Sequence, residues 1–285
     1  MSNNSNMSNT TEILNIVLSM DENNLDGMLT VINSIVTNTK HLDKIVFYLL
    51  VYEDSNEEIK NNLTRYFVNK IKYKIEEFIK YPAYVDFLNA NMNITNTNKK
   101  FKHISNIMNF ARFYLPLIYD NIDFGLYLDS DIVVQVDILD ILNNIDIENT
   151  IIASPLTKPI DSMQIHEKFG MTGNGFNTGV YFLNFKYWRD NNLTQKCEEI
   201  MIEHKITPLF ILGTQPIINI LFYEKCINLD KKWNYTGLGS KEYDQAKLAR
   251  QYILHWTGEH KPWNDGGLNK AAWEKYKITN PLTPM

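Results

Sequence analysis

The sequence predicts an α/β fold whose central sheet has a parallel core. Between residues 13 and 75, apolar runs typical of buried strands alternate with amphipathic segments typical of helices. Later in the chain, residues 124–134 form an apolar run that two carboxylates, Asp129 and Asp131, interrupt. With 285 residues and 44% hydrophobic content, the chain is long enough to bury one large core or two fused lobes.

The composition excludes several classes of protein. The formal net charge is -5 and no long basic block is present, which argues against a nucleic-acid binder. The two cysteines, Cys197 and Cys226, make neither a disulfide framework nor a metal-ligand spacing, which favours a reducing compartment. The start lacks an apolar signal core, and the longest apolar run, residues 45–52, is too short to span a bilayer. We therefore expect a soluble cytoplasmic protein without a transmembrane segment. Peripheral attachment to a membrane or assembly site stays open, as does the oligomeric state, with a homodimer as one option.

The N-terminal part begins with a polar segment, residues 1–11, that is typical of a disordered tail. Residues 13–20 are mostly apolar and bounded by polar residues, which predicts a buried strand. The strand stops at a polar loop, residues 21–24. Apolar residues at helical spacing then predict a helix over residues 25–37.

A second strand, helix and strand follow. The second strand is predicted over residues 44–51 and the third over residues 71–75. The helix between them spans residues 56–68, with Asp54 or Ser55 as its N-cap. Ligands of such parallel sheets collect beyond the carboxyl ends of the strands.

Asp129 and Asp131 form the central motif of the chain. Side chains two residues apart point the same way in an extended chain, so both carboxylates can face one point. Like charges this close repel unless a cation compensates or one pKa rises. A divalent cation that bridges to a phosphate is one solution, and an ordinary Asp-Ser turn is the other. Because residues 19–23 also follow a strand, the two segments are expected to share a site.

The middle of the chain is less regular. Residues 81–102 are rich in Asn and predict a loop, whereas residues 103–118 predict a helix that contains Arg112. Arg112 is either a surface residue or an arginine aimed at phosphate or sugar oxygens. A short helix is expected over residues 137–142, and a strand over residues 151–155.

Residues 156–175 predict a long loop, which inside a compact domain is often a lid or binding loop. The strand predicted over residues 176–184 opens with Asn177 and Gly179. A glycine there permits close approach of the backbone. Asn177 is either a turn residue or a ligand contact.

A helix is expected over residues 193–204, and another begins near Gly213. Pro216 suits the first turn of that second helix, which places Gln215 near its N-terminus. The alternative for Gln215 is an ordinary exposed helix start.

Residues 253–263 combine His255, Gly258 and Lys261 between two tryptophans. His255 follows a strand-like run, so it is either structural or a neutral nitrogen ligand to a metal. Gly258 allows a tight approach of the backbone, and Lys261 offers a point charge to a phosphate.

Three motifs in this order resemble glycosyltransferase family 8. They are Leu-Asp-Ser-Asp at 128–131, Phe-Asn-Thr-Gly at 176–179 and His-Trp-Thr-Gly-Glu-His-Lys-Pro-Trp at 255–263, within a resemblance that runs from Ile13 to about Trp263. The family comprises retaining nucleotide-sugar transferases, among them bacterial lipopolysaccharide galactosyl- and glucosyltransferases and glycogenin. The resemblance implies a GT-A type, Rossmann-like nucleotide-diphospho-sugar transferase domain over 12–265, with a mixed, mostly parallel central sheet flanked by helices. A C-terminal helix or tail is expected to follow over 266–285.

The resemblance also implies roles for single residues. Asp129, Asp131 and His255 match the residues that hold a divalent metal, Mn²⁺ or Mg²⁺, against the donor diphosphate. Gln215, Asp129 and Asp131 are expected to be catalytic. The positions implied to contact the nucleotide-sugar donor, a UDP-sugar, are Ser19, Met20, Asp21, Asn23, Arg112, Ser130, Ala153, Asn177, Gln215, Gly258 and Lys261.

The implied activity is metal-dependent, retaining transfer of glucose or galactose from a UDP-sugar to a hydroxyl of a glycan or protein-linked acceptor. One motif departs from the family, because Thr214-Gln215-Pro216 stands where Asp-Gln-Asp is common. The loss of both acids leaves the donor sugar open. It also keeps two alternatives in view: a catalytically weak or silent nucleotide-sugar- or glycan-binding module, and a self-glucosylating, glycogenin-like primer.

Overall fold

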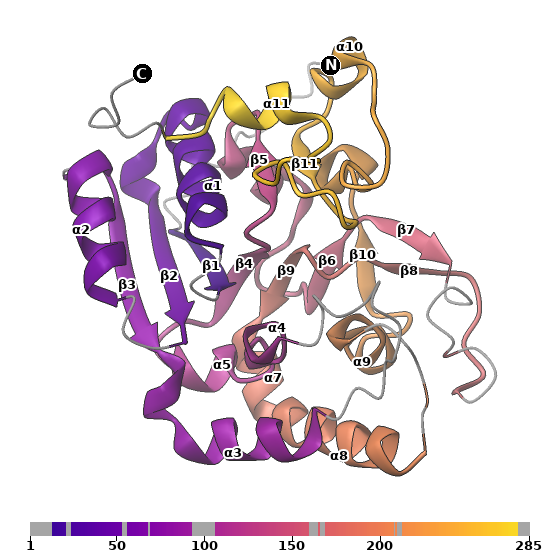
Figure 1. Cartoon of the computed structure of the whole chain (residues 1–285). Helices are drawn as coiled ribbons and strands as arrows, with labels where there is room; N and C mark the ends of the chain where they lie inside the picture. Colours follow the sequence, from indigo (N-terminus) through magenta and orange to yellow (C-terminus); the bar gives the residue numbers. More distant parts are fainter. Residues whose placement is uncertain are drawn as a thin grey trace, which may run out of the picture.

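A seven-stranded sheet forms the centre of the computed structural model, in the order β10-β6-β9-β4-β1-β2-β3 (Figure 1). The structure describes residues 13–20, 24–52, 56–67, 69–92, 106–159, 165, 169–207, 209 and 213–278. β1 pairs in parallel with β2 and β4, β2 with β3, and β6 with β10. Only β9 is antiparallel, to β4 and to β6, among the strands described for this sheet. The predicted α/β class with a mixed, mostly parallel sheet is confirmed.

The strands are short and mostly buried. Those of the central sheet are β1 (Leu14–Met20), β2 (Ile45–Val51), β3 (Lys72–Glu77), β4 (Phe124–Leu128), β6 (Ile152–Ser154), β9 (Val180–Asn184) and β10 (Cys226–Asn228). Two antiparallel pairs lie beside it: β5 (Ile132–Val134) with β11 (Ile253–His255), and β7 (Leu156–Pro159) with β8 (Asn174–Phe176).

Helices cover both faces of the sheet. The α-helices are α1 (Leu25–Asn38), α2 (Asn56–Phe67), α3 (Pro82–Asn91), α4 (Ile107–Ala111), α5 (Leu115–Ile118), α7 (Phe185–Asp190), α8 (Leu193–Ile206), α9 (Thr214–Leu221), α10 (Gln245–Leu248) and α11 (Lys270–Glu274). Short 3₁₀ helices are η2 (Leu42–Lys44), η3 (Phe78–Lys80), η5 (Ile138–Asn144) and η7 (Lys231–Asn234). No described helix is long and apolar enough to cross a membrane.

Successive side chains of a strand point to opposite faces of the sheet, and each face has its own hydrophobic core. In β1, Val17 points to one face, whereas Ile16 and Leu18 point to the other, as the period of two requires. The face that holds Val17 is covered by α3, α4, α5, α7, α8 and α9, and the opposite face by α1 and α2. Helices on both faces explain why the strands are apolar throughout rather than half polar.

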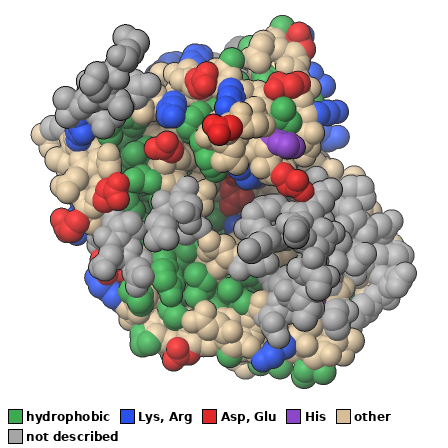
Figure 2. Space-filling view, in the orientation of Figure 1, with side chains coloured by type: hydrophobic (Ala, Val, Ile, Leu, Met, Phe, Trp, Pro, Cys, Tyr) green, Lys and Arg blue, Asp and Glu red, His purple; other side chains and the backbone are tan. Residues whose placement is uncertain are grey.

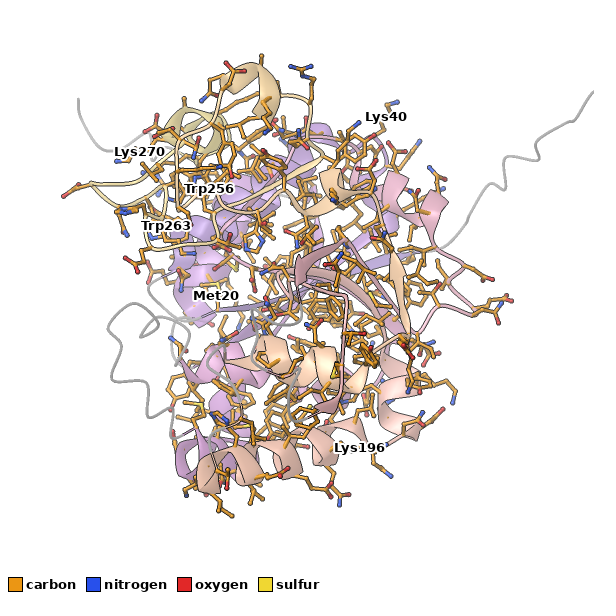
Figure 3. The ribbon with its side chains drawn as sticks, turned by 90° about the vertical axis from the view of Figure 1, so that its right-hand side faces the viewer. Met20, Lys40, Lys196, Trp256, Trp263 and Lys270 are labelled. Atoms are coloured by element: carbon orange, nitrogen blue, oxygen red, sulfur yellow. The ribbon has the colours of Figure 1, made fainter. Side chains whose placement is uncertain are left out.

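A third, smaller core ties the C-terminal part to the sheet. Val133 of β5 and Leu254 of β11 pack with Trp256, Trp273 and Tyr276. Figure 3 shows Trp256 and Trp263 within this C-terminal part, at the top of the molecule, and Lys196 in the helical layer below. The small pair β5–β11 therefore brings a segment near residue 255 back to the end of β4.

The regular N-terminal elements agree with the sequence prediction. Strands expected over 13–20, 44–51, 71–75 and 151–155, and helices over 25–37, 56–68 and 193–204, are confirmed with shifts of one or two residues. The proposed N-caps Asp54 and Ser55 lie outside the described residues, as do the tail 1–11 and the loop residues 21–23.

Two segments predicted as loops contain regular structure. Residues 82–91 form α3, because Pro82 opens a helix whose Val85 and Leu88 are buried; residues 93–102 lie outside the described part. The loop expected over 156–175 contains β7 and the start of β8, so that prediction was wrong at both ends. Its residues 160–164 and 166–168 are not described.

Two long predicted elements are broken in the structure. The helix expected over 103–118 is split into α4 and α5, with Arg112 at the end of α4 and Pro116 in the first turn of α5; residues 103–105 lie outside the described part. The strand expected over 176–184 is divided between the end of β8 and β9, with a turn at 178–179 between them. The short helix expected over 137–142 is the 3₁₀ helix η5. Helix α7 was not predicted, and Cys197 and Cys226 are free.

Candidate functional site

Polar side chains gather where β4 ends. The backbone N–H of Asp129 donates to the Gly179 carbonyl (2.8 Å), which ties the end of β4 to the start of β9. The antiparallel pair β5–β11 sets Ile132 opposite His255, and the Trp256 N–H donates to the Asp131 carbonyl (3.0 Å). Figure 2 shows a hollow in the middle of one face, with acidic side chains deep inside it.

Asp129, Asp131 and His255 form a cluster that could hold a metal ion. The Nε2 atom of His255 lies 3.1 Å from Oδ1 of Asp131 and 3.7 Å from Oδ2 of Asp129. One possible ligand atom from each residue lies within 4.8 Å of the other two. The three predicted metal ligands, which are up to 126 residues apart in sequence (255 − 129), are thus brought together.

The other oxygen of each carboxylate is held by a basic residue. Oδ1 of Asp129 accepts a hydrogen bond from Nη2 of Arg112 (3.1 Å), and Oδ2 of Asp131 accepts one from Nζ of Lys261. Each carboxylate therefore has one oxygen fixed on a cation and turns the other toward His255. The ion pairs Arg112–Asp129 and Lys261–Asp131 are thus alike, although the two basic residues are far apart in the sequence.

Arg112 is buried, with 6% of its surface exposed, and is fully engaged within the protein. Its guanidinium donates to Asn109 O and Oδ1, to Thr178 O and Oγ1, and to Asp129 Oδ1. These five contacts match the five N–H donors of an arginine. The guanidinium also lies 4.6 Å from the centre of the Tyr127 ring. In this structure Arg112 holds Asp129, and its contact with a donor stays a prediction.

Asp131 is kept ionised by its neighbours. Burial by itself raises the pKa of a carboxyl, because it disfavours the charged form. The charges and hydrogen bonds of Lys261 and His255 outweigh burial, so the pKa of Asp131 is held well below its ordinary value of 3.8. A carboxylate that is charged at all physiological pH values is an oxygen ligand always available to a cation.

His255 has oxygen atoms next to both of its ring nitrogens. It is 1% exposed, with Nδ1 at 2.9 Å from Oδ1 of Asn234 and Nε2 beside the two carboxylates. A neutral imidazole has one N–H, so one of its nitrogens turns a lone pair toward oxygen unless a proton or metal ion lies between. Two carboxylate oxygens and one imidazole nitrogen are a donor set that suits Mn²⁺ or Mg²⁺. The residues present fit a divalent cation.

A group of neutral amides lies next to this cluster. Nδ2 of Asn177 donates to Oε1 of Gln215 (3.0 Å), and Nδ2 of Asn234 donates to Oδ1 of Asn177 (3.2 Å). The predicted residues Asn177 and Gln215 are therefore in contact with each other. They reach His255 through Asn234, which was not predicted.

Gly179 is the place where both groups meet. A Cβ at this position would overlap Cε1 of His255 and would lie 2.6 Å from Oδ2 of Asp129. No other residue leaves room for that approach, so the expectation that this glycine permits a close backbone contact is confirmed. The Gly179 N–H also donates to Oδ1 of Asn177 (3.1 Å).

The remaining predicted positions surround the cluster or lie in the core. The Ser19 hydroxyl contacts the Met108 carbonyl (3.2 Å) and the Tyr127 hydroxyl (2.9 Å). Met20 and Ala153 are buried among the apolar residues of the α1 face, and Ser130 is half-buried. Asp21 and Asn23 lie outside the described residues.

The C-terminal loop brings Lys261 to Asp131. Gly258 has φ +118°, and a side chain there would meet the backbone of Gly239 at 2.6 Å. The same turn lets Nζ of Lys261 donate to the Trp256 carbonyl (2.8 Å) as well as to Asp131. Gly258 thus shapes the loop that positions Lys261.

Three residues of this site carry no signal that the sequence analysis recognised. Asn234 follows a tryptophan in η7, Asn109 lies one turn before Arg112, and Thr178 lies between two predicted positions. The Phe-Asn-Thr-Gly motif pointed to the position of Thr178 but not to its carbonyl, which accepts from Arg112. Asn109 and Asn234 were identified only by the contacts that the fold creates.

Comparisons with known proteins place the chain among glycosyltransferases. A profile described as "Glycosyl transferase family 8" matches residues 15–267. A curated relative, glycosyltransferase 8 domain-containing protein 1 of Xenopus tropicalis, is 28% identical over 302 residues, which cover 95% of this chain and 78% of that protein.

Solved structures share the fold. The galactosyltransferase LgtC, in complex with donor and acceptor sugar analogues, superimposes with a TM-score of 0.70 at 21% identity, covering 94% of this chain and 98% of that chain. The bifunctional glycosyltransferase WbbM superimposes with a TM-score of 0.71 at 19% identity, covering 95% of this chain. This chain spans half the length of the WbbM chain. At such low identities these likenesses concern the fold, which is of the GT-A type.

Proposed function

This chain belongs to glycosyl transferase family 8, and on that premise we propose that it is a metal-dependent, retaining hexosyltransferase. It would move glucose or galactose from a UDP-sugar to a hydroxyl of a glycan or protein-linked acceptor. The transferase domain would span 12–265 and the C-terminal segment 266–285. The observation that carries the proposal is the convergence of Asp129, Asp131 and His255 in a cluster that fits a divalent cation.

The cation would be held by Oδ2 of Asp129, Oδ1 of Asp131 and Nε2 of His255. When bound, Mn²⁺ or Mg²⁺ supplies positive charge that stabilises the leaving diphosphate. Arg112 and Lys261 orient the two carboxylates by holding their other oxygens. This leaves one oxygen of each carboxylate for the cation.

Lys261 would add a second positive charge near the diphosphate. Its side chain is 20% exposed, and its ammonium contacts Asp131, one of the proposed ligands of the cation. A lysine in such a place stabilises negative charge that develops on a leaving group. Ser19, Met20, Asp21, Asn23, Ser130, Ala153 and Gly258 remain proposed contacts of the donor.

Gln215 bears on how the anomeric configuration is retained. A double displacement needs a nucleophile below the sugar ring, and an amide such as Gln215 does not ionise. We therefore favour a same-face mechanism, in which the leaving phosphate activates the acceptor hydroxyl. Gln215 and Asn177 would then hold the sugar, and a trapped glycosyl-enzyme intermediate on any residue would count against this mechanism.

The test is a screen of UDP-glucose, UDP-galactose and UDP-xylose for hydrolysis and transfer, with Mn²⁺, with Mg²⁺ and with excess chelator. We expect release of UDP from one sugar only when the metal is present. Calorimetric titration with UDP and Mn²⁺ in parallel separates the alternatives, since binding without any turnover would indicate a silent nucleotide-sugar-binding module. Intact-mass analysis after incubation with the donor would reveal added hexoses if the protein modifies itself.

A further inference from the structure

Four polar side chains form one continuous line of hydrogen bonds across the site. Gln215, Asn177, Asn234 and His255 follow one another, with heavy-atom distances of 3.0, 3.2 and 2.9 Å between neighbours. Asn234 and His255 are each 1% exposed. In such dry surroundings each amide has to match a donor to an acceptor, because a mismatch would leave a buried polar group unsatisfied.

The direction of this line is fixed by the backbone. The N–H of Gly179 lies 3.1 Å from the side-chain amide of Asn177, and a backbone N–H can only donate. The atom that receives it is therefore Oδ1 of Asn177. The other end of the same amide, Nδ2, then donates to Oε1 of Gln215.

The orientation of Asn177 also fixes the orientation of the Asn234 amide, which contacts His255. Because Oδ1 of Asn177 accepts, the atom of Asn234 that faces it must be Nδ2, which leaves Oδ1 of Asn234 turned toward His255. An oxygen at 2.9 Å requires a proton on Nδ1 of the imidazole. In the neutral ring Nε2 then carries the lone pair, and Nε2 is the atom that faces Asp129 and Asp131.

We infer that Asn234 is a positioning residue that sets the tautomer of His255 and supports the orientation of Asn177 at the other end of this line of amides. At one end it holds the His255 tautomer in which Nε2 is available to a cation. At the other end it donates to the same Oδ1 of Asn177 that the Gly179 N–H fixes, and in this orientation Asn177 donates to Oε1 of Gln215. The identity of the cation rests on the proposed function, whereas the position of the proton on His255 does not.

A purely structural role for Asn234 is the alternative, and Asn219 provides the matched control. Asn219 is also a buried asparagine, 3% exposed, that donates to the carbonyls of Phe176 and Gln215 and accepts from the Phe176 N–H, each at 2.9 Å. It has no hydrogen bond to His255 among those described. Asn219→Ala should therefore cost stability as Asn234→Ala does, without changing the imidazole.

The proton is observed directly by long-range ¹H–¹⁵N correlation on protein labelled at its six histidines. His255→Gln identifies the signal of His255. We expect Nδ1 to carry a proton in the wild-type protein, with or without Mg²⁺. A protonated Nδ1 supports the inference, and a bare Nδ1 with the proton on Nε2 overturns it. This measurement needs no variant of Asn234 to fold.

The effect on the cation is measured by titration with Mn²⁺. Removal of a group that orients a metal-binding histidine weakens affinity by about 10- to 100-fold, and we expect this for Asn234→Ala. Asn219→Ala should keep the wild-type affinity. Equal affinities for wild type and Asn234→Ala, or equal losses in the two alanine variants, would overturn the inference.

Asn234→Asp separates the two ends of the line. An aspartate keeps an oxygen for Nδ1 of His255 but has no N–H to donate to Asn177. We expect Mn²⁺ affinity at least as high as in wild type, with a several-fold lower kcat for hydrolysis of the UDP-sugar. Loss of Mn²⁺ affinity in this variant would contradict the role assigned to the Oδ1 atom.

Failure of the proposed function gives a different result. If the wild-type protein binds neither Mn²⁺ nor Mg²⁺, the proposal of a metal-dependent transferase fails, while the spectrum of His255 still decides whether Asn234 sets the tautomer. If Mn²⁺ binds and Nδ1 is bare, the proposed function stands and the inference about Asn234 is overturned.

Discussion

The site has two halves that are built from different chemistry. The ionic half comprises Asp129, Asp131, His255, Arg112 and Lys261, and the amide half comprises Asn177, Asn234 and Gln215. In the ionic half every acid has a cationic partner, whereas the amide half is a line of neutral hydrogen bonds. The two halves join at His255 and at Gly179, whose N–H and carbonyl each serve one half.

The difference suggests a division of labour. Charged groups in a partly buried site interact strongly with a charged ligand, so the ionic half would bind the diphosphate and its cation. Neutral hydrogen bonds contribute about 0.5–1.5 kcal/mol each, which suits groups that fix position rather than supply charge. Substitutions in the ionic half should therefore have much larger effects than those in the amide half.

The largest effect is expected for Asp129→Asn. The asparagine keeps an oxygen for Arg112, so the fold should remain, but the charge that attracts the cation is lost. We expect Mn²⁺-dependent hydrolysis of the UDP-sugar to fall by at least about 10³-fold, with a thermal midpoint near that of wild type. Unchanged activity of the wild type in excess chelator would contradict the proposal that the ionic half binds a cation needed for activity.

Gly179→Ala should disturb both halves at once. The new methyl group would overlap His255 and crowd Asp129, so Mn²⁺ affinity should fall steeply and stability by about 1–3 kcal/mol. Gly125→Ala is the matched control, because its Cβ would lie 2.9 Å from Val17 in the core, away from the site. If both variants kept wild-type Mn²⁺ affinity, Gly179 would not be the joint between the halves.

Lys261→Met tests the basic partner of Asp131 in the ionic half. Loss of one positive charge at the diphosphate should lower kcat/KM by about 10²-fold, and the effect should weaken as salt increases. Lys270→Met is the control, since Lys270 lies in α11 and contacts the Asp265 carbonyl instead. A comparable loss in both variants would point to net charge rather than to the place of Lys261.

Gln215→Ala tests the amide half. Because Gln215 is not required to ionise in a same-face mechanism, we expect measurable turnover, reduced by about tenfold, with unchanged Mn²⁺ affinity. Gln195→Ala on the exposed side of α8 is the control. Loss of activity as complete as that of Asp129→Asn would mean that Gln215 does more than position the sugar.

His204 lies outside both halves, and we expect it to make the stability of the fold depend on pH. Burial lowers the pKa of His204 from 6.5, and its Nδ1 accepts from the Leu209 N–H (2.9 Å). Because the unfolded chain binds this proton more readily, His204 stabilises the fold at pH above about 6.5, and this contribution is lost as pH falls through the folded pKa. Urea midpoints of wild type and His204→Gln between pH 5.5 and 8 should therefore approach each other as pH falls. A difference between the two urea midpoints that does not change with pH would contradict the lowered pKa of His204.

The sequence predicted the fold best where local periodicity decides the structure. The strands around Val17 and Leu49 are apolar because helices cover both faces of the sheet, and that pattern is visible without any contact map. The prediction of one continuous helix over 103–118 was wrong, because Pro116 lacks a backbone N–H and lies in the first turn of a separate helix, α5. Helix α3 was missed because the Asn-rich composition of 81–102 hid the buried pair Val85 and Leu88.

For the site, the sequence identified residue types but not their contacts. Asp129, Asp131 and His255 were expected together, and the pairing of β5 with β11 brings them together. Arg112 donates its N–H groups within the protein, in part to Asn109 and Thr178. No spacing in the sequence identifies these two residues as its partners. Asn234 likewise acquires its place only when η7 packs beside β11.

The central claim is that His255 and the two acids hold one cation against a nucleotide diphosphate. Electron spin-echo envelope modulation of Mn²⁺ bound together with UDP detects a coordinated imidazole nitrogen and the phosphorus of the diphosphate in one sample. The account predicts both couplings in wild type, with the nitrogen coupling absent in His255→Gln. A phosphorus coupling without any nitrogen coupling from His255 in the wild-type protein would contradict it.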